Sequence, residues 1–498
     1  MKSKLLNGIS GAAIATVTLS LLAGCTLGPD FKKPAAPQAD GYTAQPLPAK
    51  TDSAKVAGGN AQEFVRAMDI PGQWWTLFHS DALNTLIEEA LRANPSLQAA
   101  QASLRQAREN LYVGNGALMP VVTASGGITR EKEPEALTGF GVSPAFNLYN
   151  ASVAVSYNVD VFGGEKRQIE SLEAQAEFQR FQVESSYLTL TSNVVTAAVS
   201  EASLRAQIQA TEDIIGSEEE ALTVLRNQFN LGGTSRSDVL AQEAAVAQAK
   251  ATLPLLTSQL TQTQNQLAAL AGRLPNQKQS EIFDLASLQL PPQLPVTLPS
   301  KLVEQRPDVR AAEEQLHAAS AQIGVARAAQ FPNFGISAQF GADALQPNEF
   351  FGAPAMLASI GGSVTQTLFD GDQLYHKKEA AIAAYDATEA TYRSTVLQAF
   401  ENVANALRAL EFDAEALRAQ LAAEQSAADS LSISRSQYQN GAITYILLLN
   451  AEQQYQTARI NLVKAQATRY ADTAALFQAL GGGWWNRKDV AAPSDAAQ

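Results

Sequence analysis

The sequence is poor in the side chains that build catalytic and metal sites. Its 498 residues include one cysteine and three histidines, and His79, His317 and His376 lie far apart without Cys or carboxylate neighbours at metal-ligand spacing. The chain also lacks the HExxH, GxSxG, P-loop and dinucleotide-binding motifs. We therefore expect no catalytic residues, no bound metal and no enzyme activity.

Basic residues are also scarce. Lys and Arg number 36 against 49 Asp and Glu, which gives a net charge of -13. Because proteins that bind nucleic acids neutralise phosphates with clustered Lys and Arg, this composition argues against a nucleic-acid partner. Aromatic residues make up only 7% of the chain, and Ala, Gln, Ser and Thr crowd its middle. Such a mixture favours long helices in close contact over a large aromatic core.

Long apolar runs are absent after the N-terminus. Lys2 and Lys4 precede an apolar run at residues 9–23, which is short for a membrane-spanning helix and is typical of a secretory signal peptide. No later stretch reaches about 18 apolar residues, the length that a spanning helix needs. If the mature chain crosses a membrane, it must therefore cross as β-strands.

The only cysteine follows this run directly. Leu22-Ala23-Gly24-Cys25 resembles a bacterial lipobox, in which the cysteine is acylated and becomes the new N-terminus. We predict a signal peptide at residues 1–24 and a covalent lipid on Cys25, with no other cofactor. Thr26 stands where an Asp would resemble an inner-membrane retention signal, so we expect anchoring in the lipid of the outer membrane. With one cysteine, no disulfide can form within the chain.

The chain after the signal is a tether followed by a duplication. Residues 26–70 are rich in Pro, Ala, Gly and Asp and predict an extended tether with little structure. Pro95, Ala99, Ala100, Leu104, Ala107 and Pro120 recur 212 positions later as Pro307, Ala311, Ala312, Leu316, Ala319 and Pro332. Phe162, Gly232 and Gly272 recur at offsets of 207 to 209 as Phe369, Gly441 and Gly481. We interpret the matches as two copies of one unit of about 210 residues.

Each copy contains two segments in which apolar and small polar residues alternate. They are residues 122–129, 152–160, 334–341 and 356–368. Alternation with one apolar face over about ten residues is what a transmembrane β-strand requires. An ordinary half-buried hairpin is the alternative for any single segment. The agreement of all four with a lipoprotein signal favours membrane strands.

Four strands cannot close a barrel by themselves. In lipid, each unpaired edge amide costs several kcal/mol, so an open sheet is excluded. Closure then requires further copies of the chain, and either a dimer with eight strands or a trimer with twelve would satisfy it. The sequence predicts oligomerisation without counting the subunits.

Most of the remaining chain is predicted to be helical. Residues 164–230 contain no proline and are dominated by Gln, Ala, Glu and Leu, and a helix of this length rises about 100 Å. A turn at Gly232-Gly233-Thr234-Ser235 leads to a return helix that ends near Ala271, with a kink predicted at Pro254. The second copy repeats this plan with a helix at residues 372–439, a turn at Asn440-Gly441-Ala442 and a return to about Leu480.

Several motifs occur in a fixed order along the chain. They are Trp74-Trp75-Thr76-Leu77-Phe78 followed by Asp81, Leu83 and Leu86, then Asp160-Val161-Phe162-Gly163-Gly164, Gly232 with Asp238-Val239-Leu240, and Leu368-Phe369-Asp370-Gly371. This order, with the duplication and the lipobox, resembles the TolC-like outer-membrane efflux factors in their lipoprotein (OprM/NodT-type) branch. The chain departs from that family at Tyr157, where Trp is frequent, at Asp372-Gln373, where a Gly-Arg-like pair is frequent, and at Asn450, where an Asp is frequent.

The resemblance implies an α+β membrane protein that works as a homotrimer. Its 12-stranded transmembrane β-barrel, with four strands from each chain, would continue as a long periplasmic α-helical coiled-coil barrel with a mixed equatorial domain. The trimer would be a passive exit duct for small molecules such as drugs. A periplasmic adaptor (membrane fusion) protein and an inner-membrane RND-type pump would complete the path.

The predicted domains follow from the resemblance and the repeat. They are a signal peptide at 1–24, a lipidated tether at 25–70, equatorial helices at 71–118, a membrane hairpin at 119–161, a periplasmic helical hairpin at 162–272, an equatorial linker at 273–300, a second-repeat helix at 301–331, a second membrane hairpin at 332–369, a second helical hairpin at 370–481 and a tail at 482–498.

The resemblance assigns two roles to the helical turns. The residues expected to contact the adaptor are Gly232, Gly233, Thr234, Ser235, Gly441 and Ala442. A gate that narrows the pore would contain Asp238, Leu447 and Asn450, with Leu447 as an apolar constriction and Asp238 as the remaining acidic residue. Arg236 is predicted to form an inter-helix salt bridge that holds this gate shut.

Other functions and other roles for conspicuous residues stay open. The same fold would suit an exit for type I protein secretion or for heavy metals, and a structural coiled-coil lipoprotein without a pore is a third possibility. We expect the pairs Trp74-Trp75 and Trp484-Trp485 to pack in the protein interior rather than to form a stacking site. We expect Glu218-Glu219-Glu220 to form a solvated helix face rather than a cation site.

Overall fold

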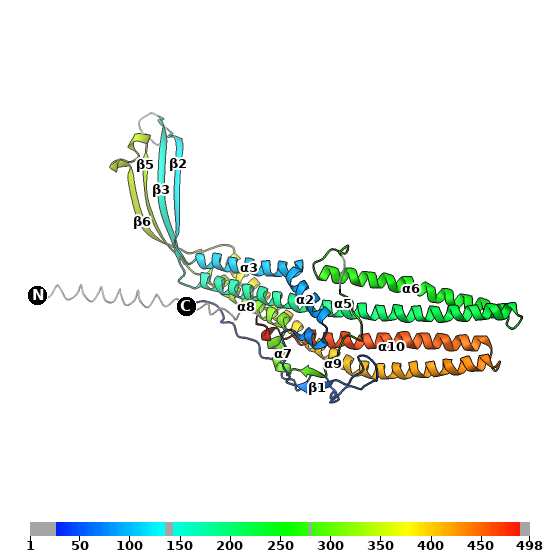
Figure 1. The fold of residues 1–498 in the computed structure, drawn as a ribbon. Helices are drawn as coiled ribbons and strands as arrows, with labels where there is room; N and C mark the ends of the chain where they lie inside the picture. The colour runs from blue at the N-terminus through cyan, green and yellow to red at the C-terminus, as the bar shows by residue number, and fades with distance from the viewer. Residues whose placement is uncertain (1–25, 135–142, 278–280, 489–498) are drawn as a thin grey trace. The chain divides into compact units, whose positions relative to one another are not determined.

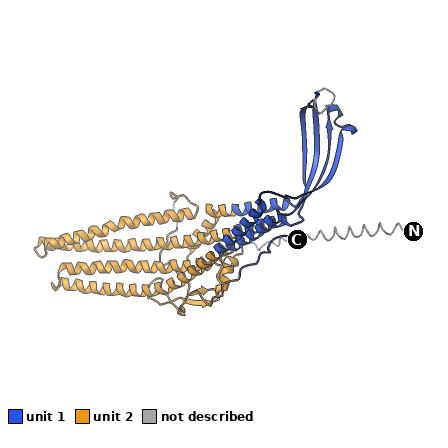
Figure 2. Cartoon of the chain, turned by 180° about the vertical axis from the view of Figure 1, so that it is seen from behind, with its two compact units in different colours: residues 1–34, 103–179, 311–392 blue, residues 35–102, 180–310, 393–498 orange. Residues whose placement is uncertain are grey.

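The computed structural model describes residues 26–134, 143–277 and 281–488. The predicted signal peptide and Cys25 lie outside the described residues, so the lipid anchor stays a prediction. The chain forms two compact units (Figure 2): unit 1 comprises residues 1–34, 103–179 and 311–392, and unit 2 comprises residues 35–102, 180–310 and 393–498. No helix of the described residues is long and apolar enough to cross a membrane.

Unit 1 contains a four-stranded antiparallel sheet. Its strands are β2 (Val121–Lys132), β3 (Ala145–Val159), β5 (Asn333–Ala344) and β6 (Met356–Thr365). They lie side by side in the order β2-β3-β5-β6 (Figure 1), so the two hairpins join through β3 and β5. The four predicted strand segments are confirmed as strands. The outer edges of β2 and β6 have no strand partner among the described residues.

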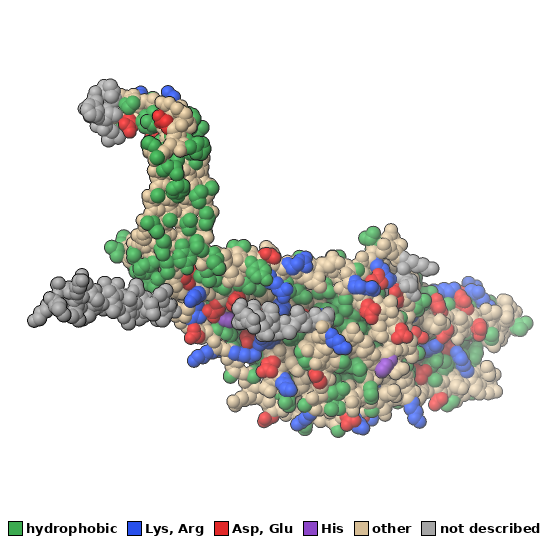
Figure 3. All heavy atoms as spheres, turned by 60° about the vertical axis from the view of Figure 1, so that its left-hand side comes forward, with side chains coloured by type: hydrophobic (Ala, Val, Ile, Leu, Met, Phe, Trp, Pro, Cys, Tyr) green, Lys and Arg blue, Asp and Glu red, His purple; other side chains and the backbone are tan. Residues whose placement is uncertain are grey.

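The register places most of the apolar residues of the four strands on one face. Ala124 pairs with Val153, which pairs with Phe340 on the next strand, and Phe340 pairs with Ala358. Residues that are directly opposed across neighbouring strands lie on the same face of the sheet. The remaining residues of that face include Val122, Ile128, Ala151, Val155, Tyr157, Phe334, Ile336, Ala338, Ile360 and Val364. Hydrophobic side chains cover the sheet in Figure 3, and most of them are exposed in the single chain.

The other face of the sheet is mainly small and polar. Ser125 pairs with Ser152, and their hydroxyl oxygens lie 3.1 Å apart. Ser156, Ser337 and Gly361 continue the same face on the neighbouring strands. The sheet therefore separates an apolar surface from a hydrophilic one over the length of its strands.

Four long helices make up most of the remaining structure. Helices α5 (Gly164–Asn230) and α9 (Gln373–Gln439) each contain 67 residues, and α6 (Arg236–Leu270) and α10 (Tyr445–Ala479) each contain 35. These bounds agree with the predicted helices to within about one residue, which is the ordinary uncertainty of a helix end. Helix α6 continues through Pro254.

The remaining elements are shorter. Their bounds are β1 (Glu63–Arg66), η1 (Trp74–Phe78), α2 (Asp81–Ala93), α3 (Pro95–Gly116), β4 (Gln293–Val296), α7 (Pro299–Gln305), α8 (Pro307–Ala328), η2 (Pro347–Glu349), η3 (Ala353–Ala355) and η4 (Trp484–Asn486). β1 pairs in parallel with β4 in unit 2. This pair joins the predicted tether to the predicted equatorial linker.

The tryptophans of unit 2 are packing residues. Trp74 and Trp75 are each 1% exposed, and the Trp74 ring stacks on Phe477 with centroids 5.4 Å apart. The indole of Trp484 donates a hydrogen bond of 2.6 Å to the carbonyl of Gln305. The prediction of interior packing is confirmed for Trp74 and Trp75, which stabilise the contact between η1 and α10.

The later part of the predicted tether is held in place by the rest of unit 2. Arg469 of α10 is fully buried and donates hydrogen bonds to the carbonyls of Gly58 and Asn60 and to the side chains of Thr51 and Gln62. These bonds fix residues 51–62 against α10 just before β1. The composition could not reveal this because the partner arginine lies about 410 residues away in the sequence.

Candidate functional site at the helical turns

The two long hairpins end in turns with the same backbone geometry. Gly232 and Gly441 have φ of 77° and 70°, a left-handed conformation that favours glycine. The next amides, of Gly233 and Ala442, each donate a 2.8 Å hydrogen bond to the carbonyl five residues earlier. This is the pattern of a Schellman helix end, and it explains why glycine occurs at the same place in both copies.

The first turn carries a complete capping box. The hydroxyl of Ser235 accepts a hydrogen bond of 3.1 Å from the amide of Asp238, and the Asp238 carboxylate accepts from the amide and hydroxyl of Ser235 and from the hydroxyl of Thr234. The hydrogen bond from the Ser235 hydroxyl is the largest of the effects that lower the pKa of Asp238. Asp238 is therefore an ionised helix cap at neutral pH, and its capping is lost only as the pH falls through that lowered pKa.

The second turn lacks this cap. Thr444 occupies the N-cap position without a side-chain hydrogen bond, and the residue three positions on is Leu447. A leucine cannot accept a hydrogen bond from the turn, so the box cannot form. Leu447 is instead 51% exposed, and Asn450, one turn further along α10, is also exposed.

Replacing Ser235 with Ala is expected to weaken the start of α6. Loss of an N-cap hydroxyl costs about 0.5–2 kcal/mol, so amide hydrogen exchange over the first turn of α6 should accelerate roughly three- to thirtyfold. Thr444→Ala is the matched control, because Thr444 makes no capping hydrogen bond. Equal acceleration in both variants would show that the Ser235 cap does not stabilise the turn.

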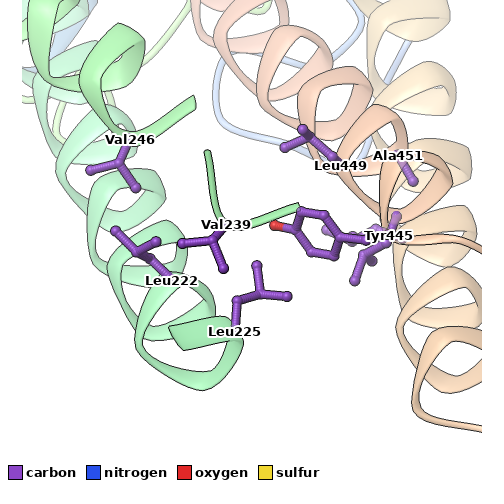
Figure 4. Packing of buried hydrophobic residues seen from close by; sticks show 9 residues of the cluster. Leu222, Leu225, Val239, Val246, Tyr445, Leu449 and Ala451 are labelled. Atoms are coloured by element: carbon purple, nitrogen blue, oxygen red, sulfur yellow. The ribbon is translucent and has the colours of Figure 1, made fainter. Parts of the chain in front are cut away.

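Next to the turns, a cluster of buried hydrophobic residues packs the two helical hairpins against each other. Leu225 of α5, Val239 of α6 and Tyr445 of α10 point toward one another in Figure 4. The other buried members are Leu222, Val246, Leu431, Leu448, Leu449 and Ala451. Residues from all four long helices therefore pack into one cluster next to the turns.

Polar bonds between the hairpins flank this cluster, and the sequence analysis missed them. The hydroxyl of Tyr445 donates to buried Gln242, the hydroxyl of Tyr438 donates to Gln228 at 3.3 Å, and Arg459 donates to Asp213 at 2.6 Å. Burial raises the pKa of Tyr445, which keeps its hydroxyl protonated as a donor. The only signal in the sequence is polar residues at scattered helical positions, which cannot be paired without the tertiary structure.

The predicted gate residues differ in their surroundings. Arg236 is exposed and makes no ion pair within the described part of a single chain, so its predicted salt bridge stays a prediction for a contact between subunits. Gly232, Gly233, Ser235, Gly441 and Ala442 are exposed at the turns, and Thr234 is half-buried. The structure thus brings the predicted tip residues to the ends of two adjoining hairpins.

The prediction for the glutamate run is wrong at one position. Glu219 and Glu220 are exposed, but Glu218 is only 3% exposed. Successive helix residues are rotated by about 100°, so three consecutive side chains cannot all lie on the outer face of a packed helix. Helix α5 turns Glu218 toward α10 instead.

Metal-binding geometry does not occur in the described residues. No three His, Cys, Asp or Glu side chains within residues 26–134, 143–277 and 281–488 gather closely enough to hold a metal ion. His317 lies 3.0 Å from Glu170 and stacks on Phe31 in unit 1. A hydrogen bond to Glu314 is the main cause that raises the pKa of His317.

Comparisons with known proteins agree with this geometry. The pyoverdine export outer membrane protein OpmQ of Pseudomonas aeruginosa is 29% identical over 432 residues, which cover 85% of this chain and 90% of that protein. The toluene efflux pump outer membrane protein TtgC of Pseudomonas putida is 28% identical over 476 residues and 95% of each chain. The solved structure of the outer-membrane channel OprN matches with a TM-score of 0.83 at 26% identity, over 92% of this chain and 100% of that one.

The family match spans both copies of the repeat. The model of the outer membrane efflux protein family matches residues 86–273 and 298–482, which include both strand hairpins and both helical hairpins. The residues between the two matched segments contain β4, which pairs with the N-terminal segment. On this evidence the chain belongs to the outer membrane efflux protein family.

Proposed function

We propose that three copies of this outer membrane efflux protein form a passive duct that carries small molecules across the outer membrane. The observation that carries the proposal is the four-stranded sheet, which has one mainly apolar face, one mainly polar face and two outer edges that no described strand pairs with. A surface of this kind suits strands that face lipid on one side and water on the other. Its strands of 10 to 15 residues are long enough to span a bilayer when tilted.

The directions of the two outer strands support an assembly of several copies. β2 and β6 run in opposite directions, because the sheet is antiparallel throughout and has an even number of strands. β6 of one copy can therefore pair with β2 of the next in the same antiparallel pattern. A twelve-stranded barrel from three copies satisfies every edge and has an interior wider than the side-chain-filled eight-stranded barrels, which suits a duct.

The repeated element order supports an internal duplication. A helix, a strand hairpin and a helical hairpin follow one another twice, and the paired helices match in length at 67 and 35 residues. We infer that the two copies alternate around the trimer, so that six similar hairpins extend into the periplasm. Six near-equivalent positions permit a closed ring of helices from only three chains.

The helical turns are proposed to form the gate and the docking site for a periplasmic adaptor protein, which would connect the duct to an inner-membrane RND-type pump. Exposed Leu447 is the apolar constriction, and a ring of such residues excludes water and ions from a narrow pore. Opening would then be a shift between two packings of the helices that adaptor binding favours. Lipid on Cys25 would anchor the assembly in the outer membrane.

Leu447→Ser is expected to raise the conductance of the purified protein in planar bilayers. A hydroxyl wets the constriction and lowers the barrier to ions, so the mean current should increase severalfold. Leu240→Ser on α6 serves as the control, because Leu240 is also 51% exposed but is not assigned to the constriction. Equal currents for wild type and Leu447→Ser would contradict the gate assignment.

The relatives export different compounds, so the substrate is assigned only as a class. OpmQ is named for pyoverdine export and TtgC for toluene efflux. The function is tested by retention of a panel of dyes, antibiotics and metal ions in cells with and without the gene. Raised retention in the deletion, restored by the intact gene but not by a tip variant, supports the duct. Unchanged retention together with loss of a secreted protein would favour the type I secretion alternative.

A further inference from the structure

A pair of acidic side chains is buried between the two helical hairpins of one chain. Glu218 of α5 is 3% exposed and Glu452 of α10 is 6% exposed. Each keeps one carboxylate oxygen, Oε2, that is shielded from solvent and has no hydrogen-bond partner in the described residues. Isolated carboxylates are rarely buried in this way, because the charged form loses its hydration.

The space around these carboxylates is small. They line a cavity of about 40 Å³ in unit 2, bounded by residues of α5, α9 and α10. A cavity of this size holds only a few water molecules, fewer than surround a carboxylate in bulk water. Burial therefore disfavours the ionised form of Glu218.

The nearby positive charges are engaged by other carboxylates. Arg435 of α9 lies 3.3 Å from Glu452, and Arg459 of α10 lies 2.6 Å from Asp213. Glu218 receives only the neutral amide of Gln456, through a hydrogen bond to its Oε1. Of the two buried acids, Glu218 therefore has no cation of its own.

The other groups around Glu218 do not supply the positive charge that its ionised form would need. Helix α6 contributes neutral Gln242, which donates to the backbone carbonyl of Glu218. Helix α10 contributes Tyr445, whose pKa is raised by burial, so its hydroxyl is neutral. The cations Lys250 and Arg226 pair with Glu219 and Glu243, at exposed positions. Burial raises the pKa of Glu218, and it raises that of Glu452 against the opposing effect of Arg435.

We propose that Glu218 is a proton-binding latch between the hairpins, whose protonated form holds α5 against α10 and whose ionised form loosens that contact. The latch lies beside the hydrophobic cluster and the bond between Arg459 and Asp213, so it acts on the same packing of four helices. The role of this latch in regulating the proposed gate rests on the proposed function. The pH dependence of the contact between the hairpins can be measured without any transport assay.

The sign of the pH dependence follows from the direction of the shift. A carboxyl group whose pKa is raised by packing stabilises that packing fully below its ordinary pKa of 4.5. The contact weakens as the pH rises from there through the raised pKa, and then stays constant. Acid therefore tightens the hairpins near the tips, and neutral or alkaline conditions loosen them.

The test is amide hydrogen exchange of the full-length protein in detergent between about pH 4.5 and 9, corrected for the intrinsic exchange rate. In the wild type, protection of residues 215–225 and 445–456 should fall with rising pH, about tenfold for each unit by which packing raises the pKa of Glu218. In Glu218→Gln, which keeps the shape without the charge, protection should be higher than in the wild type at neutral and alkaline pH and should fall less steeply, with Glu452 responsible for the remaining slope. Glu220→Gln is the matched control on the exposed face and should follow the wild type.

Two results would overturn the latch. One is a wild-type protection that does not change with pH, which needs no variant to observe. The other is a Glu218→Gln protein that keeps the wild-type slope, since other groups would then cause it. Measuring the conductance of the same proteins distinguishes the proposal of a latch from the proposal of a gate. A Glu218-dependent change in exchange without any pH effect on conductance would leave the latch in place and refute the proposed gate.

Discussion

Replacing Ile360 with Arg is expected to abolish assembly in the outer membrane. Ile360 is 84% exposed in the single chain and lies in the middle of β6, on the apolar face opposite Ala338. An arginine on the lipid face of a barrel costs about 2–4 kcal/mol near the bilayer midplane. Because three copies carry the change, the trimer would lose about 6–12 kcal/mol. That is comparable to the whole stability of an ordinary domain.

The matched control is the neighbouring residue on the opposite face. Ser359 is also exposed and stands opposite Gln339 on the other face of the sheet, so Ser359→Arg would place its charge in the interior of the proposed barrel. We expect this variant to form heat-sensitive trimers in the membrane fraction, while Ile360→Arg stays monomeric or is degraded. Normal amounts of trimer with Ile360→Arg would show that this face does not contact lipid.

Replacing Arg469 with Met is expected to release residues 51–62 from helix α10. The substitution leaves the carbonyls of Gly58 and Asn60 and the side chains of Thr51 and Gln62 without their common donor in a buried position. A buried hydrogen-bond acceptor that is left without its donor costs about 1–3 kcal/mol, so the loss of these bonds should destabilise the contact by at least that order. Limited proteolysis should therefore cut within residues 51–62, and the unfolding midpoint in urea should fall.

A second arginine that holds the same segment provides the control. Arg418 of α9 pairs with Asp52 at 2.8 Å, but its side chain is 63% exposed. Exposed ion pairs contribute at most about 1 kcal/mol, so Arg418→Met should change stability and cleavage little. Similar losses in both variants would mean that burial of Arg469 is not what fixes the segment.

The elements that the sequence predicted are those with local signals. The alternation at residues 334–341 depends only on the two-residue period of a strand, and Gly232 and Gly441 mark turns through their own backbone requirement. The bounds of the two longest helices followed because residues 165–230 contain no proline and only one glycine, Gly216, and residues 373–439 contain neither. These features need no knowledge of what each segment packs against.

The elements that the sequence did not predict depend on contacts between distant segments. The long helices show weak separation of apolar and polar faces, so nothing in the run Glu218-Glu219-Glu220 reveals which side chain turns inward. The same is true of Tyr445 and Gln242, which belong to different copies of the repeat. Arg469 looked like an ordinary surface residue of a polar helix until its partners at residues 51–62 were placed beside it.

Disulfide cross-linking between the outer edges of the sheet tests the central claim most directly. Cysteines would be introduced in pairs, one along β2 and one along β6, in the full-length protein, and oxidised in the membrane. If three copies close the sheet, pairs in register will produce cross-linked ladders of one, two and three chains and nothing larger. A ladder that stops at two chains, or no cross-link between chains at any pair, would contradict closure of the sheet by three copies.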